Sequence, residues 1–590
     1  MWGLSEVADG RHMLDFREQR TRTLFHLILT FLVGISVVTV GEASTWTNVT
    51  NLPPAAVDTM LLLTDGTVLA HQASPQCGPL WYQLTPDSTG SYINGTWSTT
   101  APMGTGRLYF ASHVLPNGKL WVLGGEYTLS GPGCNAVFTR TGEIYDPVNN
   151  TWSPIASHPE AQFGDDPTML ISTGRILAGS IGTRNTYLYD IASDTWSAAI
   201  PKVYNDRSDE ETWVMLPGNK VLTYDLFQSF GTGGAYAEVY SAATNSWSSV
   251  SPSDGTALGT IPQLTSNTLG FELGPALRLH DGRILYIGAT GHTAFFNPAT
   301  NTWSAGPDVM GTINGIPSIF GADDAPGAVT PSGHVIFAAD AGPSQFASSG
   351  DITSGSTIIA NIPSTSLLLP GWSVRGTGIP SGARISSVDS ASQVHITGAA
   401  TSTIVGDAIL WGGTFSLPTQ LFDFNPATNT ISPVTPAFTD PNAPLNPAFI
   451  YRMLVLPTGQ ILVSGSSRQL RVFTPDGFPD PAVRPVINAV TNNGGGLFTL
   501  TGKQLNGQSS GSSYGDDAES DENYPIVRFR DALGHVFYAR TTGWNNTGVA
   551  TDGAPESVNF TLNPAMPSGN YSLTVVGAGV ASFPAFINIP

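Results

Sequence analysis

Charged residues are scarce in this sequence: they make up 12% of its 590 residues, and acidic residues outnumber basic ones 44 to 24. The formal net charge of −20 argues against nucleic acid or an anionic membrane surface as a partner. The two cysteines, Cys77 and Cys134, lack zinc-finger and redox CxxC spacing, and they fit one disulfide formed in an oxidising compartment. Because no highly specific catalytic motif is present either, the sequence indicates its fold more directly than its chemistry.

Long apolar runs are also missing, with one exception near the N-terminus. Three arginines between residues 17 and 22 precede the apolar run 24–40, which ends in Gly41-Glu42-Ala43. This pattern predicts a secretory signal peptide over residues 1–43, cleaved after Ala43, with Met13 as an alternative start. The run is short for a bilayer span. We therefore expect a secreted or cell-surface protein that has no transmembrane segment after cleavage.

Glycine and proline are abundant, at 65 and 44 residues, and many of them punctuate a repeated hairpin. Each hairpin consists of two apolar, β-prone runs around a tight turn that needs positive φ. Examples are LLLTDGTVL, HVLPNGKLW and LVLPTGQIL. The turn glycines of the seven copies are Gly66, Gly118, Gly174, Gly218, Gly282, Gly333 and Gly459. A unit repeated at such intervals predicts a closed repeat architecture.

A second signal recurs in step with the hairpins: an aromatic residue, a Pro or Asx turn, then Asn/Asp-Thr/Ser-Trp. It ends at Trp152, Trp196, Trp247 and Trp303, with a looser copy at Trp97 and an isoleucine in a late copy. The two strands of each hairpin, together with the two strands on either side of this second turn, supply the four strands of a propeller blade. The last unit lacks this Trp, whereas Trp46 precedes the first hairpin. We therefore expect the N-terminal strand to complete the last of seven blades and to leave no free sheet edge.

The repeats cover residues 44–481, and two other segments stand apart from them. Residues 351–410 interrupt the sixth blade and are rich in Ser, Thr, Gly and Ile, which predicts a small β insertion. Residues 486–590 follow the repeats and alternate in short strands, a pattern typical of an immunoglobulin-type β-sandwich. The predicted fold class is thus all-β, with a seven-bladed propeller followed by a sandwich.

The blade pattern resembles that of the kelch and galactose oxidase superfamily. Tyr145-Asp146-Pro147 with Asn150-Thr151-Trp152, and Gly124-Gly125 after the second hairpin, match the kelch blade. The C-terminal part looks like the β-sandwich (E-set) that follows the propeller in galactose oxidase. A segment from SYGDDAESDENYP onward is similar to one in secreted bacterial kelch proteins. The resemblance implies a kelch-type propeller and raises the question of a copper site.

The galactose oxidase resemblance would imply one copper ion held by two tyrosines and two histidines, with one tyrosine cross-linked to a cysteine. Tyr109 falls on the segment of the cross-linked tyrosine. Residues 58–60 (DTM) stand where the cross-linking cysteine is expected. Phe449-Ile450 or Tyr451-Arg452, depending on the register, stand where a Tyr-His pair is expected. The loop expected to carry the other histidine reads TGWN at 542–545. Copper(II) favours imidazole nitrogen, so we expect no copper and no resident cofactor; Ca²⁺ stays open as an alternative.

The segments that lead into the innermost strands of the blades carry the candidate site. In a four-stranded blade they open on the same face as the loop between strands two and three. Cys77 and Cys134 occupy that second loop in neighbouring blades, where a disulfide would stiffen the rim. The candidate ligand-binding residues are Asp58, Arg107, Tyr109, Asp165, Asp166, Asp209, Glu210, Glu211, Glu272, Asp323, Asp324, Tyr451 and Arg452.

A ring of carboxylates with Arg and Tyr could bind a hydroxyl-rich sugar by directed hydrogen bonds, or a hard cation. The same residues could instead fasten one blade to the next by accepting backbone hydrogen bonds. The leading hypothesis is a monomeric recognition module for a carbohydrate or an extracellular protein. The rival is a sugar-processing hydrolase, lyase or isomerase, in which one carboxylate acts as acid or base beside Arg107 or Arg452. A diverged copper oxidase ranks third.

Overall fold

The structure is a computed structural model that describes residues 43–589 except 131–132, 268, 439, 443–445, 515–522 and 552. The predicted signal peptide lies outside the described residues, apart from Ala43. Strands dominate the described residues. Helical turns are short: α2 (Leu226–Thr232), η1 (Pro252–Asp254), η2 (Ala448–Ile450) and η3 (Pro481–Val483). The nearly all-β content agrees with the fold class predicted from the sequence.

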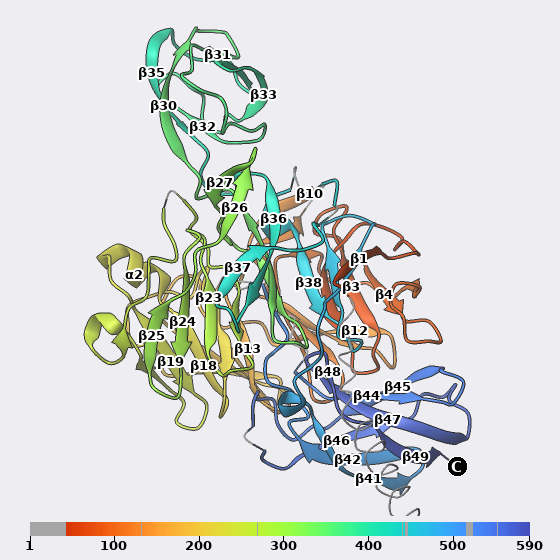
Figure 1. Ribbon diagram of the computed structural model, residues 1–590. Coiled ribbons are helices and arrows are strands. Elements are labelled where there is room, and N and C mark those ends of the chain that lie inside the picture. Colours follow the sequence, from red (N-terminus) through yellow and green to blue (C-terminus); the bar gives the residue numbers. More distant parts are fainter. Residues whose placement is uncertain are drawn as a thin grey trace, which may run out of the picture. The chain divides into compact units, whose positions relative to one another are not determined.

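Seven antiparallel sheets contain the four strands expected of a propeller blade, and we number these blades 1 to 7 (Figure 1). Blades 1 to 4, from the innermost strand outward, are β2 (Val57–Leu62), β3 (Val68–Gln72), β4 (Trp81–Thr85), β5 (Thr96–Thr99); β7 (Ala111–Val114), β8 (Leu120–Leu123), β11 (Gly142–Asp146), β12 (Thr151–Ile155); β13 (Thr168–Ser172), β14 (Arg175–Ala178), β15 (Tyr187–Asp190), β16 (Thr195–Ala198); and β17 (Val214–Leu216), β18 (Lys220–Tyr224), β19 (Ala237–Ser241), β20 (Ser246–Ser249). Blades 5 to 7 are β22 (Ala276–Arg278), β23 (Ile284–Ile287), β24 (Thr293–Asn297), β25 (Thr302–Ala305); β28 (Pro326–Val329), β29 (Val335–Asp340), β36 (Thr419–Asn425), β37 (Thr430–Pro433); and β38 (Arg452–Val455), β39 (Ile461–Ser464), β40 (Arg471–Thr474), β1 (Thr45–Asn48).

The last blade closes the ring with the first strand of the chain. β1 pairs antiparallel with β40, and Trp46 lies opposite Phe473. The Trp46 indole N–H donates to the backbone oxygen of Pro436, and its ring packs 4.8 Å from that of Phe473. The prediction that the N-terminal strand completes blade 7 is therefore confirmed, and the count of seven blades with it.

The repeated tryptophans hold neighbouring blades together. The indole N–H groups of Trp97, Trp152, Trp196 and Trp303 each donate to a backbone oxygen in a preceding segment. For Trp152 that acceptor is Ala101, just after the outer strand of blade 1. An indole needs one acceptor when its ring is packed against apolar atoms. The recurrence of Trp thus reflects the contact between blades and not stacking on a ligand.

The remaining short strands and the insertion lie between blade strands in the sequence. β6 (Arg107–Leu108), β9 (Tyr127–Ser130) and β10 (Gly133–Ala136) form one small sheet, β26 (Met310–Ile313) and β27 (Ile316–Ile319) form another, and β21 (Leu258–Gly259) adds to β25. The insertion of blade 6 is a six-stranded sheet, drawn in green to turquoise in Figure 1. Its strands are β30 (Phe346–Ile352), β31 (Ile358–Ala360), β32 (Val374–Arg375), β33 (Ile385–Ser390), β34 (Gln393–Ile396) and β35 (Ile404–Trp411).

The C-terminal region contributes its own antiparallel strands and one strand to the propeller. Its strands are β41 (Val486–Gly494), β42 (Leu497–Lys503), β44 (Ile526–Arg530), β45 (Val536–Thr542), β46 (Glu556–Thr561), β47 (Gly569–Gly577), β48 (Val580–Ala581) and β49 (Ala585–Ile589). The immunoglobulin-like description of this region stays a prediction. Between β42 and β44, β43 (Ser512–Tyr514) pairs with β28, the innermost strand of blade 6. The C-terminal region therefore reaches the inner edge of the propeller.

Candidate functional site

A cavity of about 380 Å³ opens among the segments that lead into the innermost strands. Each of the seven blades supplies at least one residue to its lining, so the cavity lies on the axis of the ring, and we call it the axial cavity. Its lining residues are Gln76, Leu108, Tyr109, Glu126, Tyr127, Asp165, Glu210, Glu272, Asp324, Phe415, Phe449 and Ile450. The volume lies in the range of small-molecule sites, roughly 300–1,000 Å³.

Five lining residues adopt a left-handed backbone conformation. One is Phe415 (φ 55°), just after the insertion, and the other four come from four different blades. Their φ values are 52° for Tyr109, 54° for Asp165, 63° for Glu210 and 49° for Asp324. Residues with a side chain are uncommon in this region, and each such position costs on the order of 1–3 kcal/mol. All four precede the innermost strand of their blade, so the same local geometry recurs around the cavity. Backbone strain of this kind gathers at ligand sites, which makes the axial cavity the leading candidate.

Carboxylates dominate the polar lining. Glu126, Asp165, Glu210, Glu272 and Asp324 face the cavity, and Asp209 stands beside it with an oxygen that lies within 4.8 Å of oxygens from Asp165 and Glu210. Burial raises the pKa of Asp209 to about 6, against the lowering effect of Arg207. Burial also raises the pKa of Glu126. A hydrogen bond from Tyr127 lowers this pKa, and the nearby charge of Asp209 raises it further. Ionisation of Asp209 and of Glu126 is therefore disfavoured chiefly by burial.

Aromatic rings form the other part of the lining. Tyr109 and Tyr127 meet edge to face with ring centroids 5.9 Å apart, and Phe415 and Phe449 do so at 4.9 Å. The β6–β9 pairing positions the first pair, because it places Leu108 opposite Tyr127. The cavity thus combines hydrogen-bonding carboxylates with apolar ring faces, the two kinds of surface that a hydroxylated ring or an organic cation needs.

A smaller space of about 80 Å³ adjoins the axial cavity and shares its Tyr109 and Phe449 lining. Asp58 and Arg452 line this annex. The Arg452 guanidinium lies 3.5 Å from the ring centroid of Tyr514 on β43, and it donates to the backbone oxygen of Phe449 at 2.6 Å. The Tyr514 hydroxyl donates to that same oxygen. The C-terminal strand therefore supports the part of the lining around Phe449.

Seven of the thirteen residues predicted from the sequence line these two spaces, and Asp209 stands next to them. The seven are Asp58, Tyr109, Asp165, Glu210, Glu272, Asp324 and Arg452. The side chains of Arg107 and Tyr451 are buried elsewhere. Arg107 donates to the backbone oxygens of Gly124 and Thr141 and pairs with Glu143 at 2.9 Å, so it fastens blade 2. It is therefore a structural residue and not a ligand contact.

Asp166, Glu211 and Asp323 are also buried away from the lining. Each is adjacent in sequence to a lining residue in the left-handed conformation, and the bend of the chain at that residue directs the two side chains to different sides. Glu211 pairs with Lys202. One oxygen of Asp323 accepts the backbone N–H of Glu272 at 3.0 Å. Burial raises the pKa of Asp166 and of Asp323 well above the usual range, with neighbouring carboxylates adding to the effect.

The predicted disulfide is confirmed, since Cys77 and Cys134 are bonded to each other. It ties the loop of blade 1 that carries Gln76 to β10. Seven lining residues of the axial cavity were not predicted: Gln76, Leu108, Glu126, Tyr127, Phe415, Phe449 and Ile450. Glu126 and Tyr127 follow Gly124-Gly125, and that pair of glycines is the sequence signal that could have indicated them. Nothing in the sequence singles out Phe415, which the fold brings in from the end of the insertion.

The lining does not fit the copper site that the galactose oxidase resemblance implies. Tyr109 lines the cavity, but Phe449 and Ile450 stand where a Tyr-His pair is needed. No histidine or cysteine is among the twelve lining residues that the structure describes. Because imidazole nitrogen is the ligand that copper(II) prefers, we derive no chemistry from copper.

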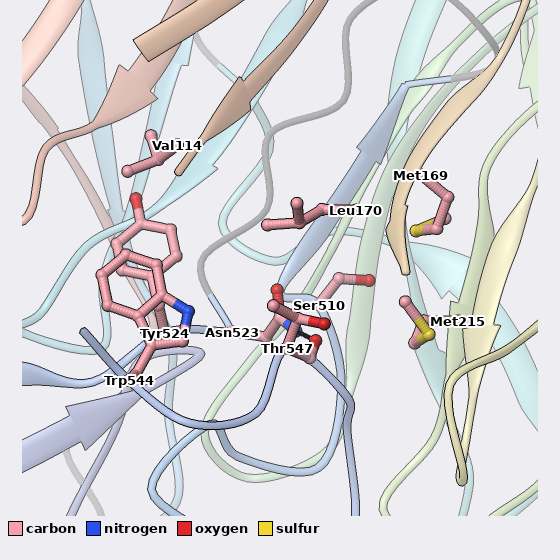
Figure 2. A pocket seen from close by; sticks show the side chains of 9 residues that line it. All are labelled: Val114, Met169, Leu170, Met215, Ser510, Asn523, Tyr524, Trp544 and Thr547. Carbon is pink, nitrogen blue, oxygen red and sulfur yellow. Dashed lines mark hydrogen bonds between the residues drawn. The ribbon is translucent and has the colours of Figure 1, made fainter. Parts of the chain in front are cut away.

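Two other spaces are less suited to a ligand. A gap of about 10 Å³ lies between Val114, Met169 and Met215 of the propeller and Asn523, Tyr524 and Trp544 of the C-terminal region. Figure 2 shows the side chains that line it. The gap is about the size of one water molecule. A cavity of about 350 Å³ beside α2 is lined mainly by glycines and small polar side chains and contains no ionisable group apart from Tyr224. The axial cavity is therefore the better candidate.

Comparison with known proteins supports the kelch resemblance over part of the chain. The Kelch motif family matches residues 107–159. The Kelch-like protein terF of Aspergillus terreus is 32% identical over 127 residues, which are 21% of this chain and 26% of that protein. The match thus spans about a quarter of this relative. Among the described residues, no helix is both long and apolar enough to cross a bilayer.

Several solved structures are similar at low identity. A fungal alcohol oxidase of the AA5 family in complex with copper is 15% identical over 90% of this chain and 84% of its own, with a TM-score of 0.31. YjhT is 11% identical over 50% of this chain and 93% of its own (TM-score 0.34). The extracellular domain of the putative hybrid two-component system BT4673 from B. thetaiotaomicron is 11% identical, covering 93% and 59% (TM-score 0.37). With TM-scores below 0.5, these likenesses decide nothing about the site.

Proposed function

We propose that this kelch-type β-propeller protein is an exported, monomeric recognition protein that binds a carbohydrate in its axial cavity. The observation that carries the proposal is the convergence of four left-handed, non-glycine residues from four blades on one cavity. Glycine adopts positive φ without strain, and Asn or Asp fills most of the other positive-φ positions of the propeller turns, whereas Tyr109 and Glu210 carry larger side chains into the cavity.

The composition of the lining supports a sugar as the ligand. Carboxylate oxygens accept hydrogen bonds from hydroxyl groups, and tyrosine hydroxyls donate as well as accept. The ring faces of Tyr109, Tyr127, Phe415 and Phe449 provide apolar surface for the C–H faces of a pyranose. The cavity is concave and its volume is at the small end of the range for ligand sites. We therefore favour a small ligand over a protein surface, which needs a contact area of roughly 800 Å² per partner.

A panel of glycans tests the proposal directly. Purified protein without its signal peptide is expected to bind at least one glycan, and Tyr109→Ala with Asp165→Asn is expected to abolish that binding while the melting temperature changes by only a few degrees. Asn tolerates left-handed backbone conformations, so it keeps the local geometry of Asp165. Binding of a glycan that the double variant retains would refute the axial cavity as its site.

Sugar processing is the second candidate, because Asp209, with a pKa raised to about 6, stands within 4.8 Å of two other carboxylates. Such a group exchanges protons near neutral pH. Release of a new product from a bound glycan, lost in Asp209→Asn but not in Asp308→Asn, would favour this reading. We propose no resident cofactor. Full glycan binding and an unchanged melting curve after treatment with a chelator are the expected results, and a calcium-dependent melting temperature would contradict them.

A further inference from the structure

Two connections of unequal length join the insertion of blade 6 to the propeller. The strand pairing of blade 6 ends at Asp340 and Thr419, and the pairing of the insertion begins at Phe346 and Trp411. Five residues lie between these pairs on the way into the insertion, whereas seven, residues 412–418, lie between them on the way out. We call 412–418 the return segment. Because it is the longer of the two, it has room to leave the strand pairing and to approach the axial cavity.

A short stretch of the insertion at β32 binds the return segment near both of its ends. The backbone N–H of Gly412 donates to the backbone oxygen of Ser373 at 2.9 Å, and the Arg375 guanidinium donates to the backbone oxygen of Gly412 at 3.2 Å. Near the other end, the indole N–H of Trp372 donates to the backbone oxygen of Leu417. The Trp372 side chain is fully buried, so packing fixes its position. We call these three residues of the insertion, at 372, 373 and 375, the clamp.

Phe415 lies in the middle of the return segment and is the residue of this segment that lines the axial cavity. Its backbone is left-handed, with a φ of 55°. A bulky residue keeps such a conformation where the surroundings impose it. The clamp bonds end on Gly412 and Leu417, which are at most three residues away on either side. The clamp is therefore placed to hold Phe415 in this conformation and its ring in the cavity.

Phe449, the other ring of the pair, is held by parts of the chain outside the insertion. Its backbone oxygen accepts hydrogen bonds from Arg452 of blade 7 and from Tyr514 of β43. The preceding residue, Ala448, donates its backbone N–H to Asp340 of blade 6. The edge-to-face pair thus has one ring fixed by the propeller and the C-terminal region and one ring fixed by the insertion. A change in the clamp is expected to move the second ring and to leave the first in place.

We propose that the insertion of blade 6 controls the selectivity of the axial cavity: the clamp positions Phe415, and the Phe415 ring decides which pyranose sugars bind tightly. This inference rests on the proposed function and names the residue that gives it selectivity. Trp372 and Arg375 are positioning residues, because they line neither the axial cavity nor the annex and act through Phe415. A return segment that is not held in advance has to become ordered when the ligand binds, and this ordering lowers affinity.

The β-1,4-linked tetramers of glucose, galactose and mannose are the probes, because they differ in stereochemistry and carry no charge. Phe415→Asn keeps a residue that tolerates the left-handed conformation and removes the ring. We expect it to weaken the tetramer that wild type binds most tightly about tenfold in calorimetry, as the loss of a buried aromatic contact does. The other tetramers are expected to lose less, so the preference among the three narrows.

The positioning role is tested with Trp372→Phe and Arg375→Met, which remove one clamp donor each and keep most of the side chain. We expect several-fold faster hydrogen exchange in the return segment without ligand, and several-fold weaker binding of the preferred tetramer. Trp411→Phe is the matched control: Trp411 is also fully buried in the insertion, but its indole donates to Ser348 of the same insertion at 2.7 Å. It is expected to keep wild-type binding, and melting curves show that each variant folds.

A double variant separates positioning from a general loss of structure. If Trp372 acts through Phe415, Trp372→Phe has no further effect on binding once Phe415→Asn is present, because coupled residues are not additive. Independent effects of the two substitutions would add up.

Five outcomes overturn the inference. They are unchanged exchange of the return segment in both clamp variants, a Trp411→Phe variant that binds as weakly as these, additive losses in the double variant, an equal loss for all three tetramers in Phe415→Asn, and binding of none of the tetramers by wild type. The proposed function is judged separately: a glycan of the wider panel that binds wild type and not the Tyr109/Asp165 double variant sustains it even when this inference fails.

Discussion

Replacing Lys202 with methionine removes an ammonium group that two buried carboxylates share. The Lys202 ammonium contacts Glu211 and lies 2.9 Å from Asp225, and all three side chains are fully buried. Asp206 is also buried, and its carboxylate lies within 4.8 Å of those of the other two acids. Glu211 directly follows the lining residue Glu210. The ion cluster therefore holds the backbone on which part of the axial cavity depends.

The magnitude follows from burial. Removing one partner of a buried ion pair leaves an uncompensated charge and costs about 3–5 kcal/mol. The carboxylates can lower this cost by taking up protons, since burial raises the pKa of Glu211 well above its usual value, with Asp206 and Asp225 contributing. We therefore expect K202M to lose stability more severely at pH 8 than at pH 5, where protonation of the acids replaces the missing positive charge.

Urea unfolding at both pH values, followed by tryptophan fluorescence, measures the effect. Lys220→Met is the matched control, because it makes the same substitution at an exposed position of β18 in blade 4. The double variant K202M/E211Q is expected to regain part of the loss, since it removes one uncompensated charge. If K202M stays within about 1 kcal/mol of wild type at pH 8, the size of a surface ion pair, the reasoning about the buried cluster is wrong.

Three further predictions concern other parts of the chain. Burial raises the pKa of Asp340 to about 7 from 3.8. Its contribution to stability, up to about 4 kcal/mol, is therefore present below pH 4 and disappears as the pH rises through 7. Asp340→Asn is expected to flatten this part of the stability curve, and an unchanged curve would contradict the assignment. Asp324→Gly is expected to raise the melting temperature slightly while it weakens glycan binding, because glycine relieves the left-handed strain; a clear loss of stability would show that the side chain is structural. Mutation of both Cys77 and Cys134 to serine removes the bond between two residues that are 57 apart in sequence. We expect a loss of about 4 kcal/mol in the free energy of unfolding and weaker ligand binding in calorimetry. Equal binding would mean that the rim does not need the bond.

The number and order of the blades could be predicted from the sequence because each rests on a local cause. Turn glycines such as Gly66 and Gly118, with φ of 76° and 79°, mark hairpins wherever a side chain would be strained. The outer-strand tryptophans recur because most blades use the same indole donor to the preceding blade segment, as Trp152 shows with Ala101. The absence of a seventh copy of this signal and the early Trp46 together predicted the closure that the pairing with Phe473 confirms.

The face that carries the site could be located from the same repeats, but its members could not all be named. Glu210 lies in a left-handed turn and lines the cavity, while its neighbour Glu211 joins the Lys202 cluster. A list of acidic positions in the sequence does not separate the two. The propeller and its closure could be predicted because their sequence signals recur in every blade region, and the rim disulfide because the chain has two cysteines in neighbouring loops. The tertiary structure decided which carboxylates face the axis and that Phe415 and Phe449 join them, since those contacts arise between blades far apart in the chain.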